Sequence, residues 1–422
     1  MSSCRHAYTL TDPAVTEDPY SFYDWMLKES PVYFDPGINM FIVASYDLIR
    51  KVALDPTTFS NQQAQLNQWN HRPGGMPARA MEILDAGVPQ VPMLVTSDPP
   101  EHKRSRVLVQ TAFTGPRVSR MRGYIEEIVK LLIDRFANNG RVELVSQFAI
   151  QLPVYVISDQ LGVPRSEYVR VKAWSDAVVG LRGLMGSDEE IIHYAETLNE
   201  FQVYFADLIA SRRARGPAED DMLDDLLNAR IGDEQLDLPE LMNVIQQLLV
   251  AGNESTTSAI TSGVAILMQH PEETPLLLGD EKRLRRFVEE VLRLEPPVQG
   301  NLRRATVDAE IGGMTIPKGS LLQLRHGAGN RDGAAFGCPN ALDVKTLKPK
   351  PHLAFGWGAH VCIGNALARE EMFIAFQTLL TRLPQLRLEP GANDFLHNRS
   401  IYIRGLRALH LAFDPAMAEQ AA

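Results

Sequence analysis

The chain has 422 residues, a formal net charge of −10, 45% hydrophobic and 22% charged residues. These values are typical of an ordinary globular protein with a large core, folded as one big domain or two. The acidic balance argues against a nucleic-acid partner. Three scattered cysteines, Cys4, Cys338 and Cys362, exclude a disulfide framework or a zinc cluster, and they fit a reducing cytoplasm.

The first hundred residues contain short elements and one long connection. Pro19–Glu29 has the pattern of a helix that begins with a proline, and Tyr46–Leu54 predicts a second helix. Between them, Val32–Asp35 and Met40–Val43 predict a hairpin. Residues 60–97 show no sustained period and predict a long irregular connection, which in compact domains is often functional.

A run of two prolines, Asp98-Pro99-Pro100, opens the next helix. His102 and Arg106 are four residues apart and therefore share one face of it. Lys103 and Arg104 predict a solvated basic face, which could also attract an acidic protein partner.

Helical periods then cover residues 121–136, 144–161, 166–180 and 188–215. The link from Leu181 to Ser187 is either a mobile lid or a plain turn between helices, and both remain open.

The longest helical pattern runs from about Pro239 to Gln269, with Asp237 as its cap. Its centre, residues 250–256, holds glycine, asparagine, serine and threonine, which are poor choices for a buried helix. Such a local inconsistency predicts a functional segment. The alternative is a patch of hydroxyl groups that bond back to the helix carbonyls.

The next helix carries Glu290 and Arg293, which can pair at a spacing of three, and it stops before Pro296. Short strands follow. Ala305–Ile311 and Thr315–Leu324 predict a small sheet.

The run from Phe355 to Gly364 places one cysteine, Cys362, in a loop with glycines at fixed positions, directly before a helical pattern. Glycines allow a tight turn and a close approach to a flat ligand. A helix start favours a thiolate. A lone cysteine held in this way suits permanent ligation of an iron, and the alternative is a buried free cysteine.

These motifs together resemble the cytochrome P450 monooxygenases of the bacterial type. The resemblance rests on Phe355-Gly356-x-Gly358-x-His360-x-Cys362-x-Gly364 with Leu367-Ala368-Arg369-x-Glu371, and on the segment Ala251–Thr256. It implies a mostly α fold with a small β-rich lobe, as one domain over residues 1–422. The β-rich parts would lie at about 31–44, 298–325 and 386–413. Haem b would lie between the long helix and the Cys loop.

The resemblance also assigns roles to residues. It makes Cys362 the axial thiolate ligand of the iron. Further haem contacts would be His102, Arg106, Ala251, Gly252, Arg303, Phe355, Gly356, His360 and Gly364. The substrate pocket would be lined by Leu94, Val250, Val298, Gln299, Asn301 and Ile401.

The oxygen-binding motif departs from the family pattern at one position. Glu254 would be the acid of a proton relay, and Ser255 stands where a threonine is usual, with Thr256 beside it. Serine keeps the hydroxyl group but lacks the methyl group that packs it. Adjacent residues on a helix point about 100° apart, so only one of the two faces the iron. Ser255 is our choice because it aligns with the motif.

The Glu290/Arg293 pair resembles a structural element of the family whose third partner is an arginine before the Cys loop. The sequence offers only Lys345, Lys348 and Lys350 there, so the third partner stays open.

The implied reaction inserts one oxygen atom from O2 into an apolar small organic substrate. Electrons would come from NAD(P)H through a ferredoxin reductase and a ferredoxin, because the chain has no glycine-rich dinucleotide motif after a strand. The N-terminus has no signal segment or membrane anchor, so a cytoplasmic enzyme is expected. Two alternatives stay open: an H2O2-dependent peroxygenase, which the Glu254-Ser255 pair argues against, and a non-catalytic haem-binding or recruitment protein.

Overall fold

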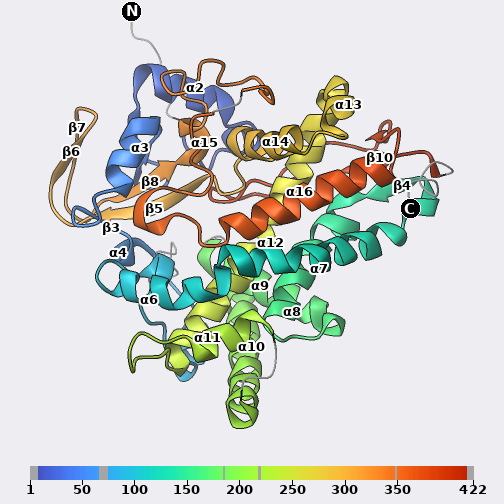
Figure 1. Cartoon of the computed structure of the whole chain (residues 1–422). Helices are drawn as coiled ribbons and strands as arrows, with labels where there is room; N and C mark the ends of the chain where they lie inside the picture. The colour runs from blue at the N-terminus through green and yellow to red at the C-terminus, as the bar shows by residue number, and fades with distance from the viewer. Residues whose placement is uncertain (1–7, 66–74, 184–185, 217–219, 347–348, 416–422) are drawn as a thin grey trace, which may run out of the picture.

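The computed structural model describes residues 8–65, 75–183, 186–216, 220–346 and 349–415. These residues form a mostly helical molecule with small sheets gathered mainly on one side (Figure 1), which is the expected fold class. None of the described helices is long and apolar enough to cross a membrane.

The helices follow the chain in two groups. Those of the first part are α1 (Pro13–Glu17), α2 (Tyr20–Glu29), α3 (Tyr46–Ala53), α4 (Gln62–Gln65), α5 (Ala78–Ala86), α6 (Glu101–Gln110), α7 (Gly115–Asp134) and α8 (Gln151–Gln160). Those of the second part are α9 (Tyr168–Gly183), α10 (Asp188–Arg215), α11 (Met222–Asn228), α12 (Leu238–Gln269), α13 (Thr274–Leu277), α14 (Glu281–Leu294), α15 (His326–Gly329) and α16 (Asn365–Arg382).

The largest sheet joins the N-terminal part of the chain to residues 300–325. Its strands lie in the order β1 (Val32–Asp35), β2 (Met40–Val43), β8 (Leu321–Arg325), β5 (Gly300–Ala305) and β3 (Phe59–Ser60). The predicted hairpin β1–β2 is present and antiparallel, and β2 pairs in parallel with β8. The other strands form a hairpin, β6 (Ala309–Ile311) with β7 (Met314–Ile316), and a sheet of β4 (Arg141–Glu143), β10 (His410–Ala412) and β9 (Arg387–Leu388).

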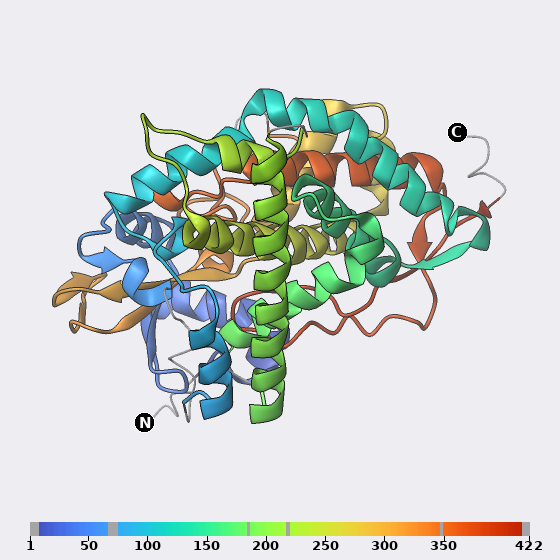
Figure 2. The same cartoon turned by 90° about the horizontal axis from the view of Figure 1, so that it is seen from below.

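The long helix α12 forms the centre of the molecule. Its first turn is fixed by a reciprocal cap, in which Asp237 accepts from the Glu240 amide at 2.9 Å and Glu240 accepts from the Asp237 amide at 3.0 Å. Most of its side chains are buried, including polar ones such as Asn243, Gln246 and Gln247. One core cluster packs it with α7, α14 and α16, and another packs it with α8, α9 and α10. Figure 2 shows α10 crossing over α12.

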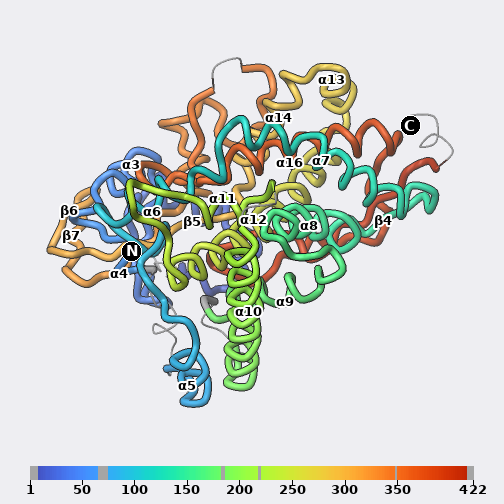
Figure 3. Tube along the Cα trace, turned by 60° about the horizontal axis from the view of Figure 1, so that its bottom comes forward, coloured from blue at the N-terminus to red at the C-terminus, as the bar shows by residue number. Residues whose placement is uncertain are grey.

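The connection 60–97 is more ordered than predicted. It contains α4 and α5, while its residues 66–74 lie outside the described part. The prediction failed at α5 because only one narrow face of this short helix is apolar. Ala80 and Ile83 are buried there, and α5 lies along α10 (Figure 3). Helix α9 includes the first three residues of the link 181–187. Residues 184–185 of the link lie outside the described part.

The third partner of Glu290 and Arg293 is Arg286, on the same helix α14. Arg286 donates to Glu290 at 2.8 Å, and Arg293 donates to it at 2.9 and 2.7 Å. The amide of Asp343 also donates to the Glu290 carboxylate, at 2.9 Å. An arginine one turn earlier on α14 therefore takes the place of the downstream arginine. The structure describes Lys345 and Lys350, and neither makes one of these bonds to Glu290.

Candidate active site

Two positions of the Cys loop have a backbone conformation that only glycine adopts without strain. Gly356 and Gly358 have φ of +72° and +75°, the left-handed region. A Cβ on Gly358 would also lie 2.8 Å from the carbonyl oxygen of Ala53. The loop then folds back, with the Cys362 amide donating to the Phe355 carbonyl at 2.8 Å, and α16 begins three residues after the cysteine.

Two opposing effects act on the pKa of the Cys362 thiol. Burial raises the pKa of its thiol, while the amide of Gly364 and the charges of Arg106 and Arg369 act to lower it. The helix start alone therefore does not produce a thiolate in the protein without a metal. A bound cation would supply the missing stabilisation, because a coordinating thiol loses its proton outright.

A cavity lies between the Cys loop and α12. Twelve of the residues predicted from the sequence line it: Leu94, His102, Arg106, Ala251, Gly252, Ser255, Thr256, Val298, Asn301, Phe355, Gly356 and His360. Cys362 and Gly364 complete this set. The remaining lining is largely apolar, with Val95, Phe113, Ile157, Leu248, Ala259, Pro297, Ile363 and Met372 among it.

One end of the cavity carries two histidines in contact. The rings of His102 on α6 and His360 in the Cys loop have centroids 4.1 Å apart. Burial and the neighbouring His102, Arg303 and Arg106 lower the pKa of His360 to about 3, so its ring is neutral. Its Nε2 atom is buried and has no hydrogen-bond partner in the described part of the chain.

Two arginines lie close to the same end. Arg303 on β5 is 4% exposed, and burial lowers its pKa to about 10, so it still carries its charge at neutral pH. Arg106 donates to the carbonyl of Val361 at 2.7 Å. Neither guanidinium has a carboxylate within ion-pair distance among the described residues. Buried cations need a counter-charge, so this end of the cavity fits an anionic group.

The donor set fits a haem. A haem brings two carboxylates, which match Arg106, Arg303 and the unpartnered Nε2 of His360, together with an iron that a Cys362 thiolate can ligate. The largely apolar lining of the cavity matches the faces of the macrocycle.

Ser255 and Thr256 on α12 both line the cavity. The Ser255 hydroxyl donates to the carbonyl of Ala251, one turn earlier, at 2.6 Å. This is the back-bonded arrangement in which a helix serine bonds to the carbonyl one turn earlier. The bond occupies the hydrogen of Ser255 and leaves its oxygen able to accept another. Thr256 is 4% exposed.

Glu254 does not line the cavity. Its carboxylate lies 3.3 Å from Nζ of Lys172 on α9, and Lys172 also pairs with Asp176. Burial lowers the pKa of the Lys172 ammonium group. The charges of Glu254 and then Asp176 raise it by more, so the net shift is upward. The acid next to the cavity is thus held in a three-member ion-pair network. The sequence offered no sign of Lys172, because its pairing depends on how α9 packs on α12.

Three residues predicted for the substrate pocket lie elsewhere. Gln299 donates to the Pro296 carbonyl at 2.7 Å and accepts from the Tyr23 hydroxyl at 2.6 Å. Val250 packs into the core cluster of α8 to α10, because neighbours on a helix point in different directions, and Ile401 packs against the cluster of α2. These three assignments are corrected: none of the three lines the cavity.

Sequence reasoning also missed two polar residues near the cavity. Gln247 on α12 lines it, and Asn61 lies with its amide nitrogen 3.4 Å from Nδ1 of His360. A glutamine within the apolar stretch of a buried helix was a signal for the first. No comparable signal marks Asn61, which lies in the segment expected to be irregular.

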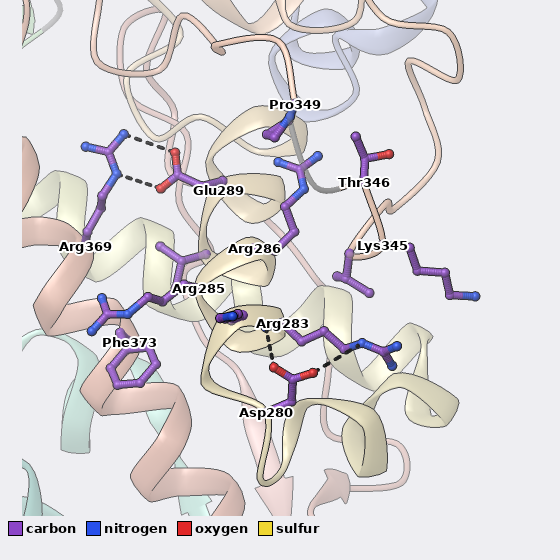
Figure 4. A pocket seen from close by; sticks show the side chains of 13 residues that line it. Asp280, Arg283, Arg285, Arg286, Glu289, Lys345, Thr346, Pro349, Arg369 and Phe373 are labelled. Atoms are coloured by element: carbon purple, nitrogen blue, oxygen red, sulfur yellow. Dashed lines mark hydrogen bonds and ion pairs between the residues drawn. The ribbon is translucent and has the colours of Figure 1, made fainter.

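A second cavity lies between α14, α16 and the segment around Thr346 (Figure 4). Its guanidinium groups are already paired within the protein. Arg369 bonds to Glu289 at 2.6 and 3.1 Å, and Arg283 lies 3.8 Å from Asp280. Arg285 and Arg286 pair likewise with carboxylates of α14 and α16. The unpaired positive end of the first cavity is therefore the stronger candidate for a charged ligand.

Comparison with known proteins agrees with this reading. The sequence model of the family described as Cytochrome P450 matches residues 282–392. Cytochrome P450 107B1 of Saccharopolyspora erythraea is 35% identical over 409 residues, which cover 94% of this chain and 96% of that protein. The 6-deoxyerythronolide B hydroxylase of the same organism is 35% identical over 320 residues, covering 76% of this chain and 77% of that one.

Solved structures show the same likeness. Cytochrome P450 CYP109Q5 from Chondromyces apiculatus superposes with a TM-score of 0.84 at 30% sequence identity, covering 96% of this chain and 98% of that one. Close similarity over nearly the whole length, together with a cavity that presents a cysteine opposite a central helix, leads to one conclusion: the chain belongs to the cytochrome P450 family and is a haem-dependent monooxygenase of the bacterial type.

Proposed function

We propose that this enzyme inserts one oxygen atom from O2 into a C–H or C=C bond of an apolar small organic molecule. The observation that carries the proposal is the cavity itself, in which apolar side chains and the hydroxyls of α12 face Cys362 across one slot. It works in the cytoplasm, where NAD(P)H supplies the electrons through a ferredoxin reductase and a ferredoxin.

In this proposal, Cys362 ligates the iron of haem b, and Arg106, Arg303, His102 and His360 bind the propionates. When bound, the haem supplies the oxidising chemistry that the side chains themselves lack. Phe355, Gly356 and Gly364 shape the thiolate side. Ala251 and Gly252 leave room on the opposite side, because small residues let other groups approach α12 closely.

Protons reach the cavity through side chains of α12. Ser255 has its own hydrogen tied to the Ala251 carbonyl, so its oxygen accepts a hydrogen bond from a group in the cavity. Glu254, held by Lys172, connects this position toward solvent, which is general acid–base work done through water. Thr256 is the neighbouring hydroxyl and takes no direct part.

The substrate is recognised mainly by shape. Leu94 and Val298 present apolar surface, and Asn301 adds one amide at the edge of the cavity. A relative named as a 6-deoxyerythronolide B hydroxylase supports hydroxylation of an organic molecule.

The test is oxygen incorporation by the purified holoenzyme. With a ferredoxin, its reductase, NADPH and 18O2, a spectrally bound substrate is expected to gain one 18O atom. Equal turnover with H2O2 and no reductase would indicate a peroxygenase instead. Tight ligand binding without turnover under either condition would indicate a non-catalytic haem protein.

Replacing Arg303 separates cofactor retention from protein stability. Arg303→Met is expected to speed haem dissociation about tenfold, because a buried carboxylate loses its cation. In the apoprotein the same change removes a buried cation that donates to the Leu302 carbonyl but pairs with no carboxylate among the described residues, so the free energy of unfolding should rise by about 1 kcal/mol. Haem transfer to apomyoglobin and denaturant unfolding of the apoprotein measure the two quantities.

Arg304 provides the control for Arg303. It is the next residue on β5, and its guanidinium bonds to the carbonyls of Gln63 and Gly319. Arg304→Met should leave haem dissociation unchanged. Faster haem loss from Arg304→Met than from Arg303→Met would contradict the assignment.

Electron delivery is expected to depend on α6. Lys103 is exposed there, whereas Arg104 is tied to Glu234 and Glu240. Lys103→Glu should slow reduction by a ferredoxin more at low salt than at high salt, because exposed charges are screened within about 10 Å at 0.1 M. Stopped-flow reduction rates at two salt concentrations measure the effect.

Lys28 gives a matched control for Lys103. It is exposed on α2, at the top of Figure 1 and away from α6. Lys28→Glu carries the same change of charge and should not alter the salt dependence. Equal effects of both variants would mean that net charge, and not docking at α6, controls the rate.

A further inference from the structure

Leu94 lies at the edge of the cavity in an unusual backbone conformation. Its φ is +45°, the left-handed region that bulky L-residues rarely adopt. Its side chain is 6% exposed and lines the cavity. A glycine would hold this conformation without strain, but it would contribute no side chain to the cavity.

The peptide groups around Leu94 are bonded from α12 by a single side chain. Gln247 donates from Nε2 to the carbonyl of Met93 at 3.0 Å. Its Oε1 accepts from the amide of Val95 at 3.3 Å. Gln247 is 8% exposed and lines the same cavity, so one amide side chain holds the two peptide groups on either side of Leu94.

Other side chains bond the two remaining polar groups of Leu94. Ser105 on α6 accepts from the Leu94 amide at 3.2 Å and donates to the carbonyl of His102 at 3.0 Å. The Ser97 hydroxyl donates to the Leu94 carbonyl at 2.9 Å. The segment is therefore held by side chains of α6 and α12, and by bonds of its own between Met93 and Thr96 and between Ser97 and Leu94.

We propose that Gln247 is a positioning residue that keeps Leu94 in its strained conformation, and that Leu94 so held sets the size of ligand the cavity admits. A strained backbone persists only where its surroundings over-determine it. Removing the Gln247 amide leaves the Val95 amide without its acceptor. The Met93 carbonyl loses one donor but keeps the amide and hydroxyl of Thr96, each at 2.9 Å. The peptide between Leu94 and Val95 is then free to turn, and the Leu94 side chain leaves its place. The inference rests on the proposed function, since it concerns the specificity of that same cavity.

The first test asks whether Leu94 is strained, using thermal unfolding of the holoenzyme. Leu94→Gly and Leu94→Ala both remove the side chain, but only glycine relieves the strain. The glycine variant should melt about 1–2 °C higher than the alanine variant. Leu248 lines the same cavity from the regular helix α12, is also 6% exposed, and serves as the matched control. There the order should reverse, because glycine weakens a helix.

The second test measures ligand size with two azoles that bind the iron, imidazole and clotrimazole. The ratio of their dissociation constants, clotrimazole over imidazole, should fall by about tenfold in Leu94→Gly and in Gln247→Met. The double variant should fall no further than either single one, because both act on the same side chain. Gln246→Met alters a buried glutamine on the same helix that does not line the cavity, and it should leave the ratio unchanged.

The outcomes separate the inference from the function beneath it. If wild-type protein gives no spectral shift with imidazole, the proposed haem site is wrong. If imidazole binds normally but Gln247→Met leaves the ratio unchanged, or if the two substitutions act additively, the positioning role is wrong. A glycine variant at position 94 that melts below the alanine variant would show that no strain is stored there.

Discussion

Cys362→His is expected to abolish the red-shifted Soret band that the reduced wild-type protein shows with CO. The band reports a thiolate ligand, and histidine replaces the thiolate by a neutral nitrogen. Monooxygenase turnover should fall by more than about 100-fold with it, because the thiolate supplies the electron density that favours O–O cleavage. Difference spectra and product analysis measure the two effects.

Cys338 is the control for this substitution, since it is a free and exposed cysteine. Cys338→Ser should keep both the band and the turnover. The opposite pattern, with the band lost in Cys338→Ser and kept in Cys362→His, would overturn the axial assignment. Haem content should be measured in every variant, so that loss of the band is not confused with loss of the cofactor.

Ser255→Ala is expected to keep substrate binding and NADH consumption while lowering the product formed per NADH by about 30-fold. The Ser255 hydroxyl is half-buried in the cavity and already oriented by its bond to Ala251, so its loss removes a fixed hydrogen-bond partner. The lost reducing power should appear as H2O2. Parallel assays of product, NADH and H2O2 give this balance directly.

Thr256→Ala removes the neighbouring hydroxyl and should uncouple the reaction far less. Thr256 also lines the cavity, so the two variants differ mainly in which hydroxyl is lost. Uncoupling confined to Thr256→Ala would move the relay one residue along α12 and refute the choice of Ser255.

Glu254→Gln should slow turnover and increase the solvent isotope effect, because a carboxylate that can accept and pass on protons is lost while the shape is kept. Asp176 supplies the matched control. It shares Lys172 with Glu254 but lies on α9, whereas Glu254 lies on α12 next to Ser255. Asp176→Asn should change the turnover less than Glu254→Gln does. An equal loss in both variants would show that the ion-pair network matters only for packing.

The sequence predicted the parts of the fold whose causes are local. The cap at Asp237, the hairpin of residues 32–43 and the start of the helix after Cys362 all depend on residues within one or two turns of each other. The glycines of the Cys loop belong to the same class, because a left-handed conformation is a property of a single residue. These features let a family resemblance be stated from the sequence alone.

Only the tertiary structure decided which side chains meet. Lys172 on α9 reaches Glu254 on α12 through the packing of two helices, which no motif records. Arg286 pairs with Glu290 at a spacing of four on α14, but only the structure shows that no downstream arginine of the described part joins them. Val250 is adjacent to the cavity residue Ala251 but does not line the cavity, because adjacent residues on a helix face different sides. Gln299 instead bonds to Pro296 and Tyr23, and Ile401 packs against the cluster of α2. The sequence determined the chemistry that is present, and long-range packing determined which of those groups face the cavity.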